Sequence, residues 1–221
     1  MPITHKVWET PAGVGARFVL VRHGEPEASA RGRCYGSLDV GLSDSGRGQI
    51  DVVARCLRQA PLAAVYTSPR RRARESAEIV ARSHELSPSV DERLGEIDFG
   101  QLEGMSYDEA AEKYPELYRA WMEQPTEVTF PDGESFDMME RRVLSAAADM
   151  RSRHRGQVVA IVTHGGVNRV LLRDALGLPK ASIFRLDQSY AALSLVDYYE
   201  HAPVVRFVNV ELDRFDHRPE C

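Results

Sequence analysis

The chain is poor in lysine, and its overall charge is mildly acidic. Of its 28 basic residues only Lys6, Lys113 and Lys180 are lysines; the rest are arginines. Its 33 acidic residues give a net charge of −5. A protein that binds nucleic acid by general electrostatics needs a basic surface, so this balance disfavours that class of partner. We interpret the excess of arginine over lysine as a general compositional bias that has no function of its own.

Cysteines are equally scarce, and they form no pattern. Cys34, Cys56 and Cys221 are odd in number and far apart, with no Cys-x-x-Cys pair. The sequence therefore predicts neither a disulfide framework nor a zinc site, and it favours a reducing compartment. Residues 1–15 contain no apolar signal-peptide core, and no apolar run approaches membrane-spanning length. We expect a cytoplasmic protein with no membrane partner.

What the sequence does contain is an alternation of short apolar strands and amphipathic helices. With 43% hydrophobic and 28% charged residues, the composition is that of an ordinary globular protein. The alternation predicts an α/β fold, a three-layer α/β/α sandwich with a mostly parallel central sheet. The predicted strands cover 18–21, 63–67, 158–163, 191–196 and 204–210, with a short edge strand at 90–94. The predicted helices cover 70–82, 137–153 and 165–177, and a further helix follows Ser43 or Asp44, either of which can cap it.

One interval interrupts the alternation. Glycines and prolines divide residues 98–135 into short amphipathic pieces, which predicts a small helical insertion over the C-terminal edge of the sheet. We interpret its aromatic residues as the insertion's own core; they are Tyr107, Tyr114, Tyr118 and Trp121. The chain, 1–221, is predicted to form a single domain with an N-terminal tail at 1–15 and a C-terminal tail at 211–221.

Three of the predicted strands run directly into charged or histidine residues. Segment 22–25 reads Arg-His-Gly-Glu, segment 68–72 reads Ser-Pro-Arg-Arg-Arg, and segment 164–166 reads His-Gly-Gly. The carboxyl ends of parallel strands meet at one edge of a sheet, where α/β proteins bind ligands. We therefore expect the three segments to converge on one crevice.

The residue types in these segments suit a phosphate group. A guanidinium fork matches phosphoryl oxygens, a neutral imidazole is a good nucleophile near pH 7, and a second, protonated histidine can hold the oxygens. The candidates are Arg22, Arg72, His23 and His164, with Glu96 as the acid for the leaving group and the backbone N–H groups of Gly165 and Gly166 at a helix N-terminus. The sequence thus predicts phosphoryl transfer through a side chain.

Six segments, in order along the chain, resemble those of one family. They are Leu-Val-Arg-His-Gly-Glu (20–25), Tyr-Gly-x-x-Asp-x-x-Leu (35–42), Ser-Pro-x-x-Arg-Ala-x-Glu-Ser-Ala (68–77), Leu-Gly-Glu-Ile-Asp-Phe-Gly-x-x-Glu-Gly (94–104), Pro-x-Gly-Glu-Ser (131–135) and Thr-His-Gly-Gly (163–166). Between about residues 17 and 210 the chain therefore resembles the histidine phosphatase superfamily, also called phosphoglycerate-mutase-like.

The resemblance implies a role for each candidate. His23 would be the nucleophile that becomes phosphohistidine, and Glu96 would protonate the leaving oxygen. Arg22, Arg72 and His164 would hold the phosphoryl group, and neither a metal nor a cofactor is implied. The residues expected to contact phosphate or substrate are Arg22, His23, Ser29, Tyr35, Gly36, Arg72, Glu96, His164 and Gly165.

Within the family, two features resemble the α-ribazole phosphatase-like branch. They are the segment Phe-Arg-Leu-Asp-Gln at 184–188 and the modest distance along the chain from Glu96 to His164, which is usually longer in the mutases. Ile-Asp-Phe at 97–99 also stands where the mutases favour basic and histidine residues. The resemblance implies a metal-independent phosphomonoesterase acting on a small phosphate ester, with α-ribazole 5′-phosphate the most specific candidate.

Three positions depart from the usual family pattern. Pro26 and Ser29 stand where threonine and asparagine are usual, which leaves the substrate-binding loop unassigned. Arg70 stands where leucine is usual, and together with Arg71 it either widens the positive field or faces solvent.

Two other functions stay open. A phosphoglycerate mutase would use the same intermediate and return the phosphoryl group to its substrate, so the two enzymes differ in how well water is excluded. A non-catalytic phosphate-binding or docking domain is the third hypothesis, against which the presence of both histidines, both arginines and Glu96 argues. A homodimer through an edge strand or through the insertion is also open.

Overall fold

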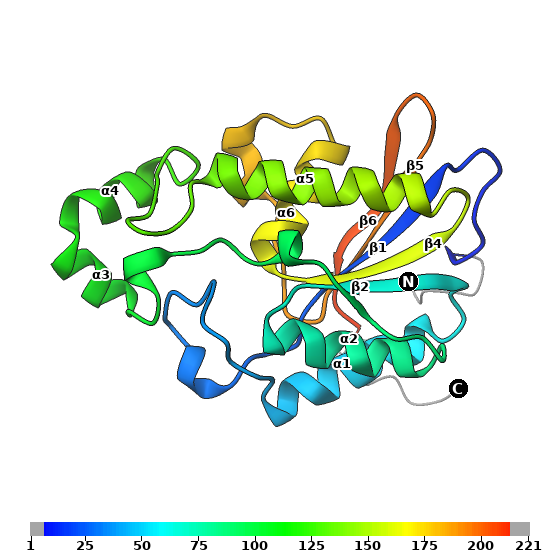
Figure 1. Cartoon of the computed structure of the whole chain (residues 1–221), viewed down its shortest axis with the longest axis horizontal. Coiled ribbons are helices and arrows are strands. Elements are labelled where there is room, and N and C mark those ends of the chain that lie inside the picture. The colour runs from blue at the N-terminus through cyan, green and yellow to red at the C-terminus, as the bar shows by residue number, and fades with distance from the viewer. Residues whose placement is uncertain (1–6, 213–221) are drawn as a thin grey trace.

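A computed structural model describes residues 7–212, which form a mixed α/β fold around one six-stranded sheet (Figure 1). The strand order is β3-β2-β4-β1-β5-β6. The first four strands of that order pair in parallel. Strand β5 pairs antiparallel with β1, and β6 pairs antiparallel with β5. The mostly parallel sheet is confirmed. Its strands are β1 (Ala16–Arg22), β2 (Leu62–Thr67), β3 (Ser89–Val90), β4 (Val158–Thr163), β5 (Leu193–Tyr198) and β6 (Pro203–Val210).

Helices cover both faces of the sheet. In Figure 1, α5 and α6 lie on one side of it and α1 and α2 on the other. Successive residues of β1 therefore enter different cores: Phe18 packs with α5 and α6, whereas Val19 packs with α1 and α2. Because both faces are covered, the central strands β1 and β4 are buried along almost their whole length and are mostly apolar. The helices are α1 (Asp44–Leu57), capped by Ser43, α2 (Arg71–Arg82), α5 (Phe136–Arg153) and α6 (Gly165–Ala175).

The predicted edge strand at 90–94 is wrong in its extent. Only Ser89–Val90 pairs with β2, and Glu92–Leu94 forms a 3₁₀ turn. The Asp91 side chain accepts a hydrogen bond from the Arg93 backbone N–H, which turns the chain out of the strand. Leu94 is buried in the core between the sheet and α5, and Glu96 follows two residues later.

The inserted segment is helical and has its own small core. It contains α3 (Tyr107–Lys113) and α4 (Pro115–Glu123), which lie apart from the sheet on the left of Figure 1. Leu102, Trp121 and Phe130 form its centre. None of the helices within residues 7–212 is long and apolar enough to cross a lipid bilayer.

The described part of the predicted N-terminal tail packs against the domain. Trp8 is buried, and Arg17 on β1 donates hydrogen bonds to the backbone oxygens of Val7 and Glu9. The same arginine pairs with the buried Asp197 on β5 at 2.5 Å. The rest of the predicted tails, residues 1–6 and 213–221, lies outside the described residues.

Candidate active site

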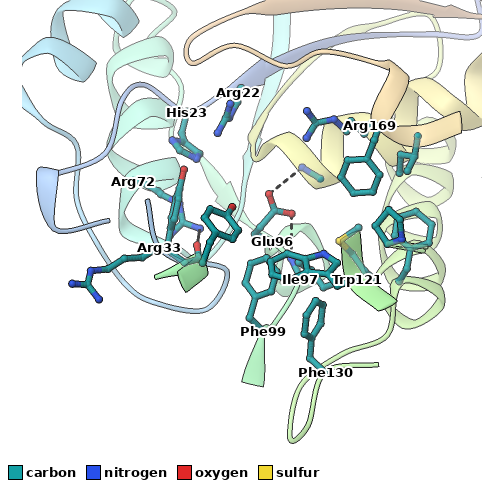
Figure 2. A pocket seen from close by; sticks show the side chains of 18 residues that line it. Arg22, His23, Arg33, Arg72, Glu96, Ile97, Phe99, Trp121, Phe130 and Arg169 are labelled. Carbon is teal, nitrogen blue, oxygen red and sulfur yellow. Dashed lines mark hydrogen bonds between the residues drawn. The ribbon is translucent and has the colours of Figure 1, made fainter. Parts of the chain in front are cut away.

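The three strand-end segments lie at one edge of the sheet and border one pocket. Their strands β2, β4 and β1 are neighbours and run in parallel, so their carboxyl ends meet. Figure 2 shows Arg22, His23, Arg72 and Glu96 around this pocket, whose cavity volume is about 220 Å³. The pocket therefore has room for more than a phosphoryl group.

His23 is buried and is held in one orientation. Its Nδ1 lies 2.7 Å from the carbonyl oxygen of Gly24. A carbonyl can only accept a hydrogen bond, so Nδ1 carries the proton and Nε2 keeps its lone pair. Burial, with help from Arg72 and Arg22, lowers the pKa of His23 well below its usual value. The ring is therefore neutral near pH 7 and can act as a nucleophile.

The turn after β1 depends on a glycine. A Cβ at Gly24 would overlap the backbone of Gly46 in the first turn of α1. Only glycine allows α1 to approach this closely, and the approach brings the Gly24 carbonyl to the His23 ring.

His164 is the N-cap residue of α6 and lies beside His23, with 5.2 Å between ring centroids. Its Nε2 is 2.7 Å from the Ser68 hydroxyl, which also accepts a hydrogen bond from the Arg70 backbone N–H. The hydroxyl can donate its proton to Nε2, and through its second lone pair it can equally accept from a protonated Nε2. Nδ1 is buried and has no partner within residues 7–212. When Nδ1 carries a proton, as it does in the protonated ring, His164 offers an unpaired donor to a bound anion.

The expectation that His164 is held protonated is not supported by the protein's own groups. Burial and the nearby Arg72 lower the pKa of His164 well below its usual value. A phosphoryl dianion between the rings and the guanidinium groups would supply the missing negative charge and favour the protonated form.

Arg22 has a guanidinium group fixed by the chain after α6. Its Nη1 donates to the Gln188 carbonyl at 2.5 Å, and its Cζ lies 4.0 Å from the centre of the Tyr190 ring. Its Nε is buried and unpaired among the described residues. A buried N–H without an acceptor is costly, and a phosphoryl oxygen would supply one.

Arg72 is fully buried, and it ties the loop at 35–38 to the site. Its Nη atoms donate to three backbone oxygens, those of Tyr35, Gly36 and Leu38. Its Nε is buried and has no acceptor in the described part of the chain, like that of Arg22. Neither guanidinium has a carboxylate within ion-pair distance among residues 7–212. Two uncompensated positive charges therefore flank His23.

Glu96 is oriented by two backbone N–H groups. Its Oε2 accepts from Gly166 at 3.0 Å and its Oε1 from Ile97 at 3.1 Å, the dashed lines of Figure 2. A Cβ at Gly166 would overlap Glu96 Oε1, so a larger residue at this position would push the carboxylate away from its present place. Glu96 is thus fixed at the border of the pocket that His23 shares.

The remaining predicted site residues divide into two groups. Tyr35 lines the pocket, Gly36 is buried and accepts from Arg72, and Gly165 opens α6 beside Arg22. Ser29, in contrast, is exposed and does not line the pocket. It lies on the short 3₁₀ turn Ala28–Ala30, of which only Ala30 is buried.

Arg70 and Arg71 have different surroundings. Arg71 is exposed, donates to Glu75 at 2.7 Å and pairs with Glu27 at 3.6 Å. Arg70 is half-buried, its Nε has no partner within the described range, and its charge contributes to the lowered pKa of His164. Arg70 therefore widens the positive field of the site, and Arg71 belongs to the surface.

The sequence patterns missed several residues of the site. Tyr190 lies 5.7 Å from His23 between ring centroids and hydrogen-bonds Tyr35 through the two hydroxyls at 2.8 Å. No motif surrounds Tyr190, since it approaches from the loop before β5. Arg169 lines the pocket from α6 one helical turn after Gly165 and Gly166, and this spacing of four and three residues could have indicated it.

The far wall of the pocket is aromatic. The rings of Tyr107 and Tyr118 contact Trp121 in tilted and edge-on arrangements, as an internal core requires, and Tyr107 and Trp121 also line the pocket. The apolar lining residues are Ile97, Phe99, Trp121, Phe130, Phe136, Met139, Ile183 and Phe184. No group of three or more histidine, cysteine or acidic side chains within residues 7–212 is arranged to hold a metal ion.

Known proteins share this sequence pattern and this fold. The sequence model of the histidine phosphatase superfamily (branch 1) matches residues 18–211. A bifunctional protein of Mycobacterium tuberculosis is 39% identical over 204 residues, which are 91% of this chain and 56% of that protein. The chain thus spans little more than half the length of that relative.

Two further relatives match over nearly their whole length. Phosphoserine phosphatase 1 of Hydrogenobacter thermophilus is 33% identical over 194 residues, which are 88% of this chain and 92% of that protein. The crystal structure of the α-ribazole phosphatase from Shigella flexneri superimposes with a TM-score of 0.81 at 26% identity, covering 88% of this chain and 96% of that one.

Proposed function

The chain belongs to the histidine phosphatase superfamily and is a phosphatase; on that premise we propose that it hydrolyses a small phosphorylated metabolite through a phosphohistidine on His23, without a metal. The observation that carries the proposal is the orientation of His23. Its Nδ1 proton is fixed on Gly24, its Nε2 is free, and the unpaired Nε groups of Arg22 and Arg72 flank it.

The first step transfers the phosphoryl group to the enzyme. His23 Nε2 attacks phosphorus, a P–N bond forms and the P–O bond to the leaving group breaks. Arg22, Arg72 and His164 hold the oxygens, and donors already fixed in place there stabilise the charge of the transition state. The departing oxygen keeps the bonding electron pair and takes a proton from Glu96.

The second step releases inorganic phosphate. Glu96, now a carboxylate, accepts a proton from a water molecule that attacks phosphorus. The P–N bond breaks, its electron pair returns to Nε2, and the neutral imidazole is restored. The products are an alcohol and inorganic phosphate, and the enzyme regains its starting protonation.

The substrate is the finer part of the proposal. The names of the similar proteins offer phosphoserine and α-ribazole 5′-phosphate as candidates, and both are small phosphate monoesters. The pocket beyond the phosphoryl site admits such a leaving group, since its volume exceeds that of a phosphoryl group. The partner that we propose is therefore a small-molecule phosphate ester.

The proposed function is tested with p-nitrophenyl phosphate in the presence of EDTA. We expect turnover that EDTA does not reduce. Loss of turnover on chelation would contradict the proposal. Isomerisation of 3-phosphoglycerate without release of phosphate would replace it with a mutase.

Replacing Glu96 with glutamine is expected to slow poor leaving groups far more than good ones. Glutamine cannot donate the proton, so kcat/KM should fall roughly 10²- to 10³-fold for phenyl phosphate and less than about tenfold for p-nitrophenyl phosphate. Steady-state kinetics with both esters measures the difference, because kcat/KM reports the steps up to the first irreversible one. Equal losses for the two esters would remove Glu96 from the acid role.

A further inference from the structure

Arg169 is an arginine of the pocket that the phosphoryl chemistry does not use. It lies on α6, and its Nε donates to the Leu186 carbonyl at 2.8 Å. Within residues 7–212 no carboxylate lies within ion-pair distance of it. Arg173, one turn further along the same helix, is by contrast paired with Glu140. Among the described residues, Arg169 thus has no carboxylate in direct contact at the border of the pocket, and Glu96 and Asp187 act on its charge only from a greater distance.

The surroundings of this guanidinium group are apolar. The Phe184 ring lies 5.5 Å from its Cζ, and Ile183 and Met139 line the same part of the pocket. Burial among them lowers the pKa of Arg169. An anion that reached this place would gain more from the half-buried guanidinium than from a fully exposed one, because less water screens the pair. The planar fork suits a carboxylate in particular.

Arg169 also lies close to the place where the leaving group departs. A Cβ at Gly165 would be 3.3 Å from Arg169 Nη1 and 3.5 Å from Arg22 Nε. The next residue, Gly166, holds the carboxylate of Glu96. The general acid and the Arg169 fork therefore lie against consecutive glycines of α6. Figure 2 shows both at the same border of the pocket.

The charges of the site leave a place for a second anion. Arg22, Arg72 and Arg169 have no carboxylate partner in the described structure. Before the leaving group departs, Glu96 must be protonated and so carries no charge. A phosphoryl dianion held by Arg22, Arg72 and His164 then leaves the positive charge of Arg169 unbalanced. That charge lies on the leaving-group side, where a substituent of the leaving group can reach it.

We propose that Arg169 is a specificity residue that binds a carboxylate of the substrate, and that the substrates are phosphate monoesters with a carboxylate two or three bonds from the ester oxygen. The proposal rests on the proposed function, since it concerns the leaving group of that reaction. It favours a phosphorylated hydroxy or amino acid over an uncharged nucleoside-like leaving group.

A pair of probe esters tests the subsite. O-Phospho-L-serine and O-phosphoethanolamine share the phosphate and the amine and differ by the carboxylate. We expect the unaltered enzyme to favour phosphoserine, and Arg169→Gln to lower kcat/KM for phosphoserine on the order of 10- to 100-fold. The same variant should change kcat/KM for phosphoethanolamine less than about threefold, because this ester has no carboxylate and so loses no charge-assisted hydrogen bond.

Arg33→Gln provides the matched control. Arg33 also lines the pocket, but it donates to the Gly104 carbonyl and is paired with Glu109 at 3.5 Å, so its charge is already balanced. We expect Arg33→Gln to leave the ratio of the two kcat/KM values unchanged. Arg169→Lys should recover part of the preference, since it restores the charge without the fork.

Three results would overturn the inference. They are equal losses for the two esters in Arg169→Gln, no preference in the unaltered enzyme, and a larger kcat/KM for α-ribazole 5′-phosphate than for phosphoserine. Turnover of p-nitrophenyl phosphate by Arg169→Gln shows that the variant is folded. If that turnover still depends on His23, the proposed function stands even where the subsite fails.

Discussion

His23→Ala is expected to lower kcat for p-nitrophenyl phosphate by at least about 10⁴-fold, or roughly 5 kcal/mol of barrier. The alanine variant retains the charged clamp of Arg22 and Arg72, but nothing in it can form the P–N bond. Residual turnover would have to come from direct attack by water on the bound ester. Steady-state release of p-nitrophenol at saturating substrate measures the loss.

His201→Ala is the control for this prediction. His201 is exposed in the turn between β5 and β6, far along the chain from the site segments. Its replacement should leave kcat within about twofold, as is usual for surface positions. A His23→Ala enzyme that kept a tenth or more of the original kcat would show that His23 is not the nucleophile.

The second large loss of kcat/KM is expected when Arg72, which is buried, is replaced, whereas its neighbour Arg71 is exposed and should tolerate replacement. Arg72→Gln should lower kcat/KM on the order of 10³-fold, because one buried guanidinium both faces the phosphoryl site and holds the loop at 35–38. Arg71→Gln should change kcat/KM less than about twofold, since Arg71 is exposed and pairs with Glu75 outside the pocket. Parallel kinetics on the two variants measures the contrast.

The structural role of Arg72 calls for a second variant. Removing it leaves three backbone oxygens without their donor, so thermal unfolding of Arg72→Gln must be measured beside its kinetics. Arg72→Lys keeps the charge, yet one ammonium cannot serve the loop and the phosphoryl group together, and kcat/KM should still fall about 10²-fold. Similar kcat/KM values for the variants at 71 and 72 would show that Arg72 does not hold the phosphoryl group.

Sequence patterns were sufficient to predict the elements that place the chemistry. The apolar runs of β1, β2 and β4 are unambiguous because both faces of the central sheet are buried. Since these strands are parallel, their ends were bound to meet, and the predicted convergence of Arg22, Arg72 and His164 followed. The functional roles of these residues stay predictions until the variants are measured.

Other parts of the site could not be predicted, and the reasons are physical. Tyr190 reaches His23 from the loop before β5, where no periodicity or motif marks a residue. Ser29 is expected in the pocket because it stands where the family usually has asparagine, yet it lies exposed on the 3₁₀ turn Ala28–Ala30. The extent of β3 was missed because a local side-chain bond of Asp91 outweighs the strand pattern.

Arg169 is the most instructive case. Its helix and its helical face were predictable, but an unpaired charge is recognised only when all the neighbouring carboxylates are placed. Arg173 on the same helix has a similar sequence context and is neutralised by Glu140 on α5. Whether an arginine can bind a ligand therefore depends on whether a carboxylate from another element, far away in the sequence, already forms an ion pair with it.

The central claim, a phosphoryl group carried on His23, is tested most directly by trapping it. The enzyme is mixed with a ³²P-labelled phosphate ester, quenched in alkali within one turnover, digested and analysed by peptide mass spectrometry. A phosphorus–nitrogen bond to imidazole survives alkali and is cleaved by acid. We expect alkali-stable, acid-labile label on the peptide that contains His23. Label that survives acid, or that lies on a peptide without His23, would contradict the account.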